Sequence, residues 1–191
     1  MRTVFIAIIA ALTAAGVGLL PANAASAVSG KTVQIVGTES FQPDEFFSIT
    51  YRFTPRHVTV HSGQPITWNN QTTDGHTVSI VAPADVPKTV NQVNNCGICN
   101  QLQAAHFPNG APPAGQPVLV LEDFKPANPP AHFDAPGDSV VVPPPGLGLP
   151  LSVTAIVTAP AGSELSYICA FHPWMQGTIR VLPPSDPDAD N

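Results

Sequence analysis

The stretch YICAFHPWM, residues 167–175, carries three side chains with metal-binding atoms within seven consecutive residues. They are the thiol of Cys169, the imidazole of His172 and the thioether of Met175. These ligand types suit copper. The spacing Cys-x-x-His-x-x-Met, at the end of a predicted strand, lets one tight turn present all three to the same ion. The sequence therefore predicts a metal-binding turn here.

One cysteine and two histidines with a weak axial methionine form the ligand set of blue-copper electron-transfer sites. His76 is the candidate for the second histidine, because it opens the predicted strand 76–81 directly after the turn TTDG at 72–75. Ligands at loop ends on a rigid scaffold are typical of such sites. We therefore predict one copper ion bound by His76, Cys169, His172 and Met175. The alternative is that Cys169 is an inert core cysteine, as buried free cysteines commonly are.

The rest of the chain reads as short strands joined by irregular loops. Apolar residues alternate with polar ones, which is typical of half-buried strands, and the 23 prolines argue against long helices. These features predict an all-β sandwich. Its predicted strands are 31–37, 47–53, 58–60, 65–69, 76–81, 117–121, 138–142, 151–158, 164–170 and 178–182.

Two stretches resemble the cupredoxin family, especially its amicyanin-like and plastocyanin-like members. YICAFHPWMQGTIRVL at 167–182 resembles the C-terminal ligand loop, and PRHVTVHSGQPITWNNQTTDGHTVSI at 55–80 resembles the first-ligand region. The resemblance maps the equatorial ligands onto His76, Cys169 and His172 and the axial ligand onto Met175. It implies a Greek-key β-sandwich, one type 1 copper ion and electron transfer between redox protein partners.

The chain departs from this family pattern in two ways. Thr77 follows the first histidine, where many members have an asparagine that ties the ligand loops together. A threonine hydroxyl can still bridge the loops, so we expect altered tuning of the site rather than its loss. The interval from His76 to Cys169 is also much longer than in small members, and the excess falls mainly at 83–137. We interpret 83–137 as a loop insertion with some short structure of its own.

The two ends of the chain are predicted to lie outside the folded domain. Residues 1–24 combine a positive start, an apolar run and the small residues Ala22-Asn23-Ala24, which indicates a signal peptide. Cleavage after Ala27 is possible, and a membrane anchor is the competing interpretation. The acidic, proline-rich residues 184–191 are predicted to be a disordered tail. We thus expect an extracytoplasmic protein with a domain at 30–183 and no stable membrane insertion after signal cleavage.

The excess of acidic over basic groups argues against one class of partner. Without residues 1–24 the chain has 6 basic and 13 acidic groups. Nucleic-acid binding requires a basic patch, which this composition does not supply, so we expect no nucleic-acid partner. We predict a monomer that exchanges electrons with redox proteins.

The pair Cys96-Gly97-Ile98-Cys99 is the second cysteine signal. A C-x-x-C pair indicates a redox disulfide or half of a metal site, and His106 and His132 are the candidates to complete such a site. No amphipathic helix is predicted beside the pair, so a thioredoxin-like centre lacks support. Cysteine parity favours a structural disulfide that clamps the long segment, with Cys169 left for copper.

Two other functional classes remain as alternatives. An exported copper-sequestering or copper-delivery protein would favour an exposed, methionine-rich site, but outside the predicted signal the chain has only Met175. A copper enzyme would need further copper ligands, and the sequence has no His-x-His-type cluster. We therefore predict an electron carrier without a substrate-turnover site.

Overall fold

The computed structural model describes residues 30–106 and 130–183, which form twelve strands and two short helices. The strands are β1 (Lys31–Val36), β2 (Glu39–Gln42), β3 (Phe46–Ile49), β4 (Arg52–Thr54), β5 (His57–His61), β6 (Pro65–Asn70), β7 (His76–Val81), β8 (Ala131–Phe133), β9 (Ser139–Val142), β10 (Ser152–Val157), β11 (Glu164–Ile168) and β12 (Gln176–Leu182). The helices are α1 (Val90–Asn94) and α2 (Gly97–His106).

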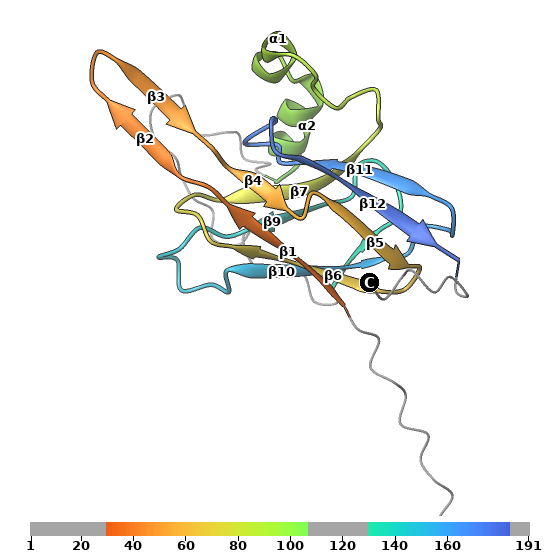
Figure 1. The fold of residues 1–191 in the computed structure, drawn as a ribbon. Coiled ribbons are helices and arrows are strands. Elements are labelled where there is room, and N and C mark those ends of the chain that lie inside the picture. The colour runs from red at the N-terminus through yellow and green to blue at the C-terminus, as the bar shows by residue number, and fades with distance from the viewer. Residues whose placement is uncertain (1–29, 107–129, 184–191) are drawn as a thin grey trace, which may run out of the picture.

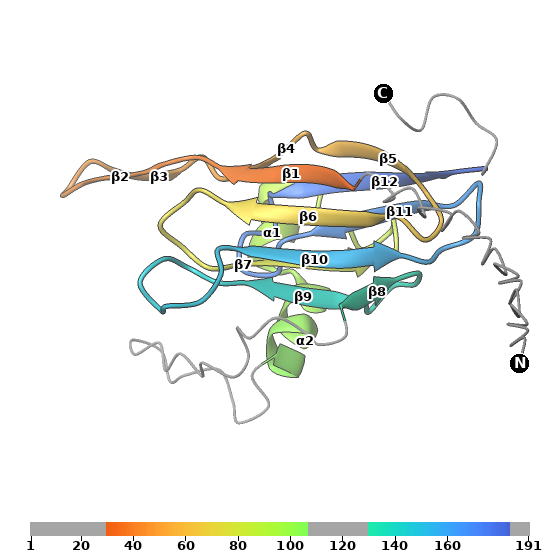
Figure 2. The same ribbon diagram turned by 90° about the horizontal axis from the view of Figure 1, so that it is seen from below.

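Ten of the strands build two facing five-stranded sheets (Figures 1 and 2). The first has the order β4-β1-β6-β10-β8, and the second has the order β5-β12-β11-β7-β9. Strands distant in sequence are neighbours: β1 runs parallel to β6, and β12 runs parallel to β5. The prediction of an all-β sandwich is confirmed.

The core lies between the sheets because the strands alternate buried and less buried residues. In β6 and in β10 every second side chain is buried, and both sets point into the same interior. The Trp68 ring from the first sheet lies 5.9 Å from the Tyr167 ring of the second and 5.5 Å from the Phe133 ring. Burial of these large rings supplies much of the hydrophobic stabilisation that holds the sheets together.

Two strands and both helices were not predicted from the sequence. β8 lies inside the predicted insertion 83–137, yet it pairs with β10 and buries Phe133 in the core. Helix α2 contradicts the expectation that no helix lies beside the C-x-x-C pair; its apolar pattern is weak, because only Cys99 and Leu102 are buried. The predicted strand 117–121, the signal peptide 1–24 and the tail 184–191 lie outside the described residues.

The helical segment covers the outer face of the second sheet. Every residue of β7 is buried, which is expected for a strand that is covered on both sides. A second apolar cluster accounts for the outer cover; it consists of Val81, Cys96, Cys99, Leu102, Ile168 and Ala170. The back of the strand that leads to Cys169 is thus packed against α2 and the turn before it.

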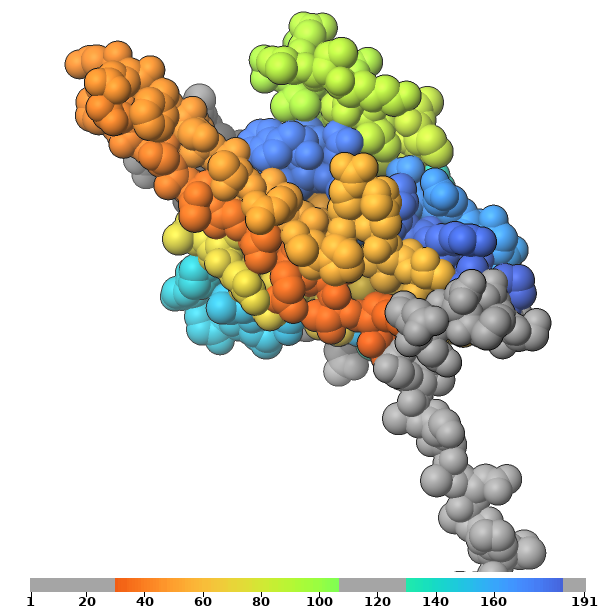
Figure 3. All heavy atoms as spheres, in the orientation of Figure 1, coloured from red at the N-terminus to blue at the C-terminus, as the bar shows by residue number. Residues whose placement is uncertain are grey.

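The β2–β3 hairpin projects beyond the sandwich (Figures 1 and 3). Phe41 and Phe47 face each other across its two strands and are 72% and 64% exposed. At its base, Glu39 accepts hydrogen bonds from the hydroxyls of Tyr51 and Thr73. The hairpin is therefore anchored next to the turn that precedes His76. Within the described ranges, no helix is both long and apolar enough to cross a membrane.

Candidate metal centre

Cys169 follows the last residue of β11 and lies fully buried as a free thiol. The backbone N–H of Thr77 donates a hydrogen bond to its sulfur, with an N-to-Sγ distance of 3.3 Å. The Thr77 hydroxyl accepts a hydrogen bond from the N–H of Ala170 at 2.7 Å. Thr77 therefore ties the first-histidine strand to the cysteine loop from two directions. The prediction that a threonine hydroxyl can bridge the loops is confirmed.

His76 begins β7 and is fully buried beside the sulfur. Its Nδ1 atom lies 3.8 Å from Cys169 Sγ. The other ring nitrogen, Nε2, lies 2.7 Å from the hydroxyl of Thr72. This contact occupies Nε2 and so leaves Nδ1 as the nitrogen directed at the thiol.

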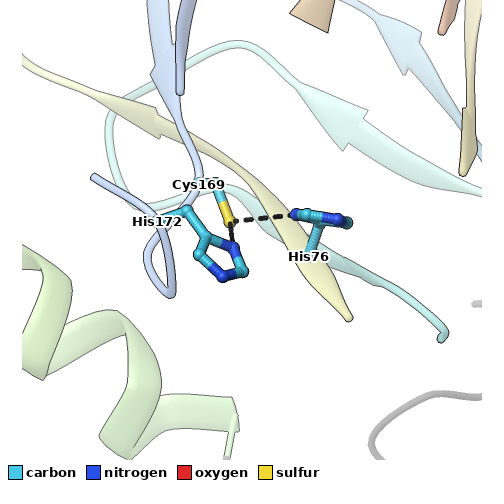
Figure 4. A group of neighbouring side chains, drawn as sticks. All are labelled: His76, Cys169 and His172. Carbon is cyan, nitrogen blue, oxygen red and sulfur yellow. Dashed lines mark hydrogen bonds between the residues drawn. The ribbon is translucent and has the colours of Figure 1, made fainter. Parts of the chain in front are cut away.

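His172 reaches the same sulfur from the turn after β11. Its Nδ1 atom lies 3.6 Å from Cys169 Sγ, and its Nε2 atom lies 3.2 Å from Asp74 Oδ2. Figure 4 shows the two imidazoles on different sides of the thiol, one from the start of β7 and the other from the turn. The Asp74 carboxylate is about half exposed, so His172 connects the buried sulfur to the protein surface.

The turn that carries His172 is closed by backbone hydrogen bonds. The N–H of Met175 donates to the carbonyl of His172 at 2.8 Å, and the N–H of Cys169 donates to the carbonyl of Met175 at 3.0 Å. Met175 is 1% exposed and belongs to the same apolar cluster as Cys169. Trp174, by contrast, is 41% exposed, and its ring lies 5.2 Å from the His172 ring.

Electrostatics favour a thiolate at the centre of this group. Burial raises the pKa of Cys169, but hydrogen bonds with His172 and His76 outweigh that effect and lower it to about 6. Burial lowers the pKa of His172, while hydrogen bonds with Asp74 and Cys169 raise it to about 9 overall. The hydrogen bond from His172 lowers the pKa of Asp74 against an opposing effect of burial. Metals are ligated by a thiolate and by neutral imidazoles, so a cation bound here would find the thiolate preformed and would displace the proton from His172.

Three of the four predicted ligands converge on one point. The ligand atoms of His76, Cys169 and His172 all lie within 4.8 Å of one another, and all three residues are buried. Two imidazole nitrogens and one thiolate, with a buried thioether in the same turn, suit a single copper ion of the type 1 kind. The structure therefore brings His76 next to Cys169 and His172, which lie more than ninety residues further along the chain.

Three neighbours of the histidines were not identified from the sequence. Thr72 and Asp74 each contact one imidazole through the nitrogen that faces away from Cys169. The Tyr51 ring stands edge-on to both imidazoles, with centroids 5.2 Å from His76 and 5.1 Å from His172. The turn 72–75 was predicted only as a turn; the polar side chains within it were the available signal.

Cys96 and Cys99 form a disulfide, so they do not bind a second metal. His106, proposed as a partner for such a site, instead lies 2.7 Å from the hydroxyl of Ser139 through its Nε2 atom. His132 is exposed on β8, opposite Ile156 of β10. The favoured prediction of a disulfide is confirmed, and the alternative of a second metal site is wrong.

Comparisons with known proteins find similarity only at the level of structure. No family model matches the chain, and neither does any curated protein sequence. A reduced amicyanin mutant is 15% identical over 80% of this chain and 81% of its own, with a TM-score of 0.35. A purple cupredoxin from Nitrosopumilus maritimus is 15% identical over 79% and 98% of the two chains, with a TM-score of 0.33. Oxidised plastocyanin from Dryopteris crassirhizoma is 18% identical over 78% and 98%, with a TM-score of 0.35.

Proposed function

We propose that this protein is an extracytoplasmic single-electron carrier with one type 1 copper ion bound by His76, Cys169, His172 and Met175. The observation that carries the proposal is a buried free thiol with an imidazole Nδ1 atom within 4 Å on each of two sides. A copper ion bound there supplies one-electron chemistry between its Cu(II) and Cu(I) states.

The protein's contribution is to hold the ligands still. Thr77 links the two ligand-bearing loops, and Thr72 fixes the orientation of the His76 ring. The backbone hydrogen bonds within the turn 169–175 restrict the remaining ligands. The ligands are buried and held by hydrogen bonds. Little structural rearrangement therefore accompanies the gain or loss of an electron, and this keeps electron transfer fast.

Electrons are expected to enter and leave on the side of His172. The imidazole connects the buried thiol with Asp74 and Trp174, both of which reach solvent. His76 and Met175 lie deeper in the protein. We propose that redox protein partners contact this surface and that the carrier acts as a monomer without nucleic acid or membrane insertion.

A copper-sequestering or copper-delivery protein is the second candidate, and the site argues against it. Delivery requires ligands that release the ion, and such sites favour exposed thioethers. Here the three strong ligands are buried and hydrogen-bonded to neighbouring groups. Slow transfer of copper to a strong chelator, together with fast electron exchange, would distinguish the carrier from a delivery protein.

The primary experiment is the visible absorption spectrum of protein loaded with Cu(II), compared with that of Cys169→Ser. We expect an intense thiolate-to-copper band that disappears in the variant, because serine lacks the sulfur orbital. A Met175→Leu variant should keep an intense band, since the axial contact is weak. If the original protein shows only weak absorption that the Cys169→Ser change leaves unaltered, the proposed ligand set is wrong.

A further inference from the structure

The Cys96–Cys99 disulfide lies at the start of helix α2. Cys96 directly precedes the first helical residue, Gly97, and the N–H of Cys99 donates a hydrogen bond to Cys96 Sγ at 3.3 Å. Free N–H groups and the positive end of the helix dipole stabilise a thiolate in this position. When the bond opens, negative charge is therefore better accommodated on Cys96 than on Cys99.

The two cysteines also differ in their exposure to solvent. Cys96 is 8% exposed and Cys99 is 1% exposed. Cys96 lines a surface pocket of about 240 Å³ whose wall includes Asp85, Val86, Gln92, Asn95 and Ile98. Both cysteines belong to the apolar cluster behind β11, but Cys99 is not among the residues that line the pocket. An incoming thiol thus meets Cys96 first, while Cys99 is shielded.

The bond is poorly placed to act as a clamp. It joins residues three apart, and the stabilisation from a disulfide grows with the length of chain it closes. It does not link the helical segment to the sandwich. That connection is made by the apolar cluster and by Gln103, whose side-chain amide donates to the carbonyl of Ala170 at 2.7 Å.

The geometry points to a thiol–disulfide exchange centre at Cys96 and Cys99 that accepts two electrons from a dithiol entering the pocket. One substrate thiolate attacks Cys96 Sγ, a mixed disulfide forms, and the Cys99 sulfur leaves and takes a proton. The second substrate thiolate then attacks the substrate sulfur of the mixed disulfide and releases the Cys96 thiolate. The products are one substrate disulfide and the reduced cysteine pair, so two electrons are transferred; the substrate thiols release two protons, of which Cys99 takes one and solvent takes the other while Cys96 remains a thiolate.

The test compares the two single-cysteine variants of the full chain, loaded with Cu(I) so that the metal does not oxidise thiols. Each is incubated with oxidised glutathione, and the mixed disulfide is located by peptide mass spectrometry. Cys96 in the Cys99→Ser variant should react at least about tenfold faster than Cys99 in the Cys96→Ser variant. Reduced dithiothreitol should also open the original disulfide without denaturant. Equal rates, or a disulfide that resists dithiothreitol until the protein is unfolded, would overturn the inference.

A double variant, Cys96→Ser with Cys99→Ser, separates exchange from a structural role. We expect it to fold and to retain any thiolate-to-copper band that the original protein shows; an unfolded double variant would overturn the inference. The exchange is measured on peptides and is therefore independent of the copper spectrum. Exchange without a blue band would contradict only the proposed electron carrier, and a blue band without exchange would contradict only this inference.

Discussion

The two sides of the segment formed by β11 and Cys169 present sulfur in opposite chemical settings. On the inner side, Cys169 is a single thiol surrounded by two imidazoles and a backbone N–H donor. On the outer side, its neighbours Ile168 and Ala170 contact the cluster that contains the Cys96–Cys99 disulfide. Because successive side chains of a strand point to opposite faces, this segment separates the thiol of the candidate metal centre from the disulfide. The chemical state of each sulfur is thus set by the groups around it, although the two sites lie on either side of one segment.

If the outer side only supports the strand, a change there should lower stability without changing the copper spectrum. Leu102→Ala is the sharpest such change, because Leu102 is 6% exposed and lies in the outer cluster. We expect a loss of about 2–5 kcal/mol in the free energy of unfolding, the range for buried leucine truncations. Denaturant unfolding of the metal-free protein measures it. Leu151→Ala is the matched control, since Leu151 is 39% exposed and should cost little.

A shift of the thiolate-to-copper band in Leu102→Ala would contradict the chemical separation of the two sides. It would mean that the packing of the outer cluster reaches through Ile168 and Ala170 to the ligand geometry. An unchanged band with the expected loss of stability would show that the outer side supports the strand without affecting the ligands.

The sequence predicted the ligands that lie close together in the chain. It did not predict contacts that form only when distant segments fold together. Cys169, His172 and Met175 share one short turn, so their proximity follows from spacing alone. His76 was identified because a strand beginning with histidine after a turn is a favourable ligand position. Helix α2 was missed because its apolar pattern is weak, with two buried residues among ten.

The residues that contact the ligands from outside the site could not be predicted from the sequence either. The Asp74 carboxylate meets His172 although the residues are nearly a hundred positions apart. That pairing depends on the antiparallel pairing of β7 with β11 in the second sheet, which places the turn 72–75 beside the turn after β11. Likewise β8 is only three residues long and follows a proline-rich stretch, so its place beside β10 could not be deduced from a local pattern.

On the inner side, Thr77→Val tests whether the threonine hydroxyl holds the ligand loops together. The variant keeps the shape of the side chain but removes the acceptor for the buried N–H of Ala170. An unpaired buried donor costs about 1–3 kcal/mol, so we expect a loss of stability in that range. The absorption band should also broaden or shift, because the two loops are less firmly joined. Spectra and denaturant unfolding measure the two effects.

Thr77→Ser is the matched variant, since it retains the hydroxyl. It should restore the band and most of the stability. If Thr77→Ser and Thr77→Val behave alike, the methyl group rather than the hydrogen bond is what matters, and the inner side would depend on packing just as the outer side does.

The smallest expected effect concerns Asp74, the partly exposed residue that contacts His172. In Asp74→Asn the amide oxygen can still accept the hydrogen bond of His172, so the change removes mainly a negative charge. A nearby carboxylate stabilises the more positive oxidised site, so its loss should raise the reduction potential. Partial exposure and screening limit the effect to about 0.5–1 kcal/mol, or about 20–40 mV for a one-electron couple. Voltammetry at low and high salt measures the shift, which salt should reduce.

Asp44→Asn is the control, because it removes an equal charge at the tip of the hairpin, where asparagine also tolerates the positive φ of 62°. An equal shift in both variants would show that net charge, not the contact with His172, sets the potential.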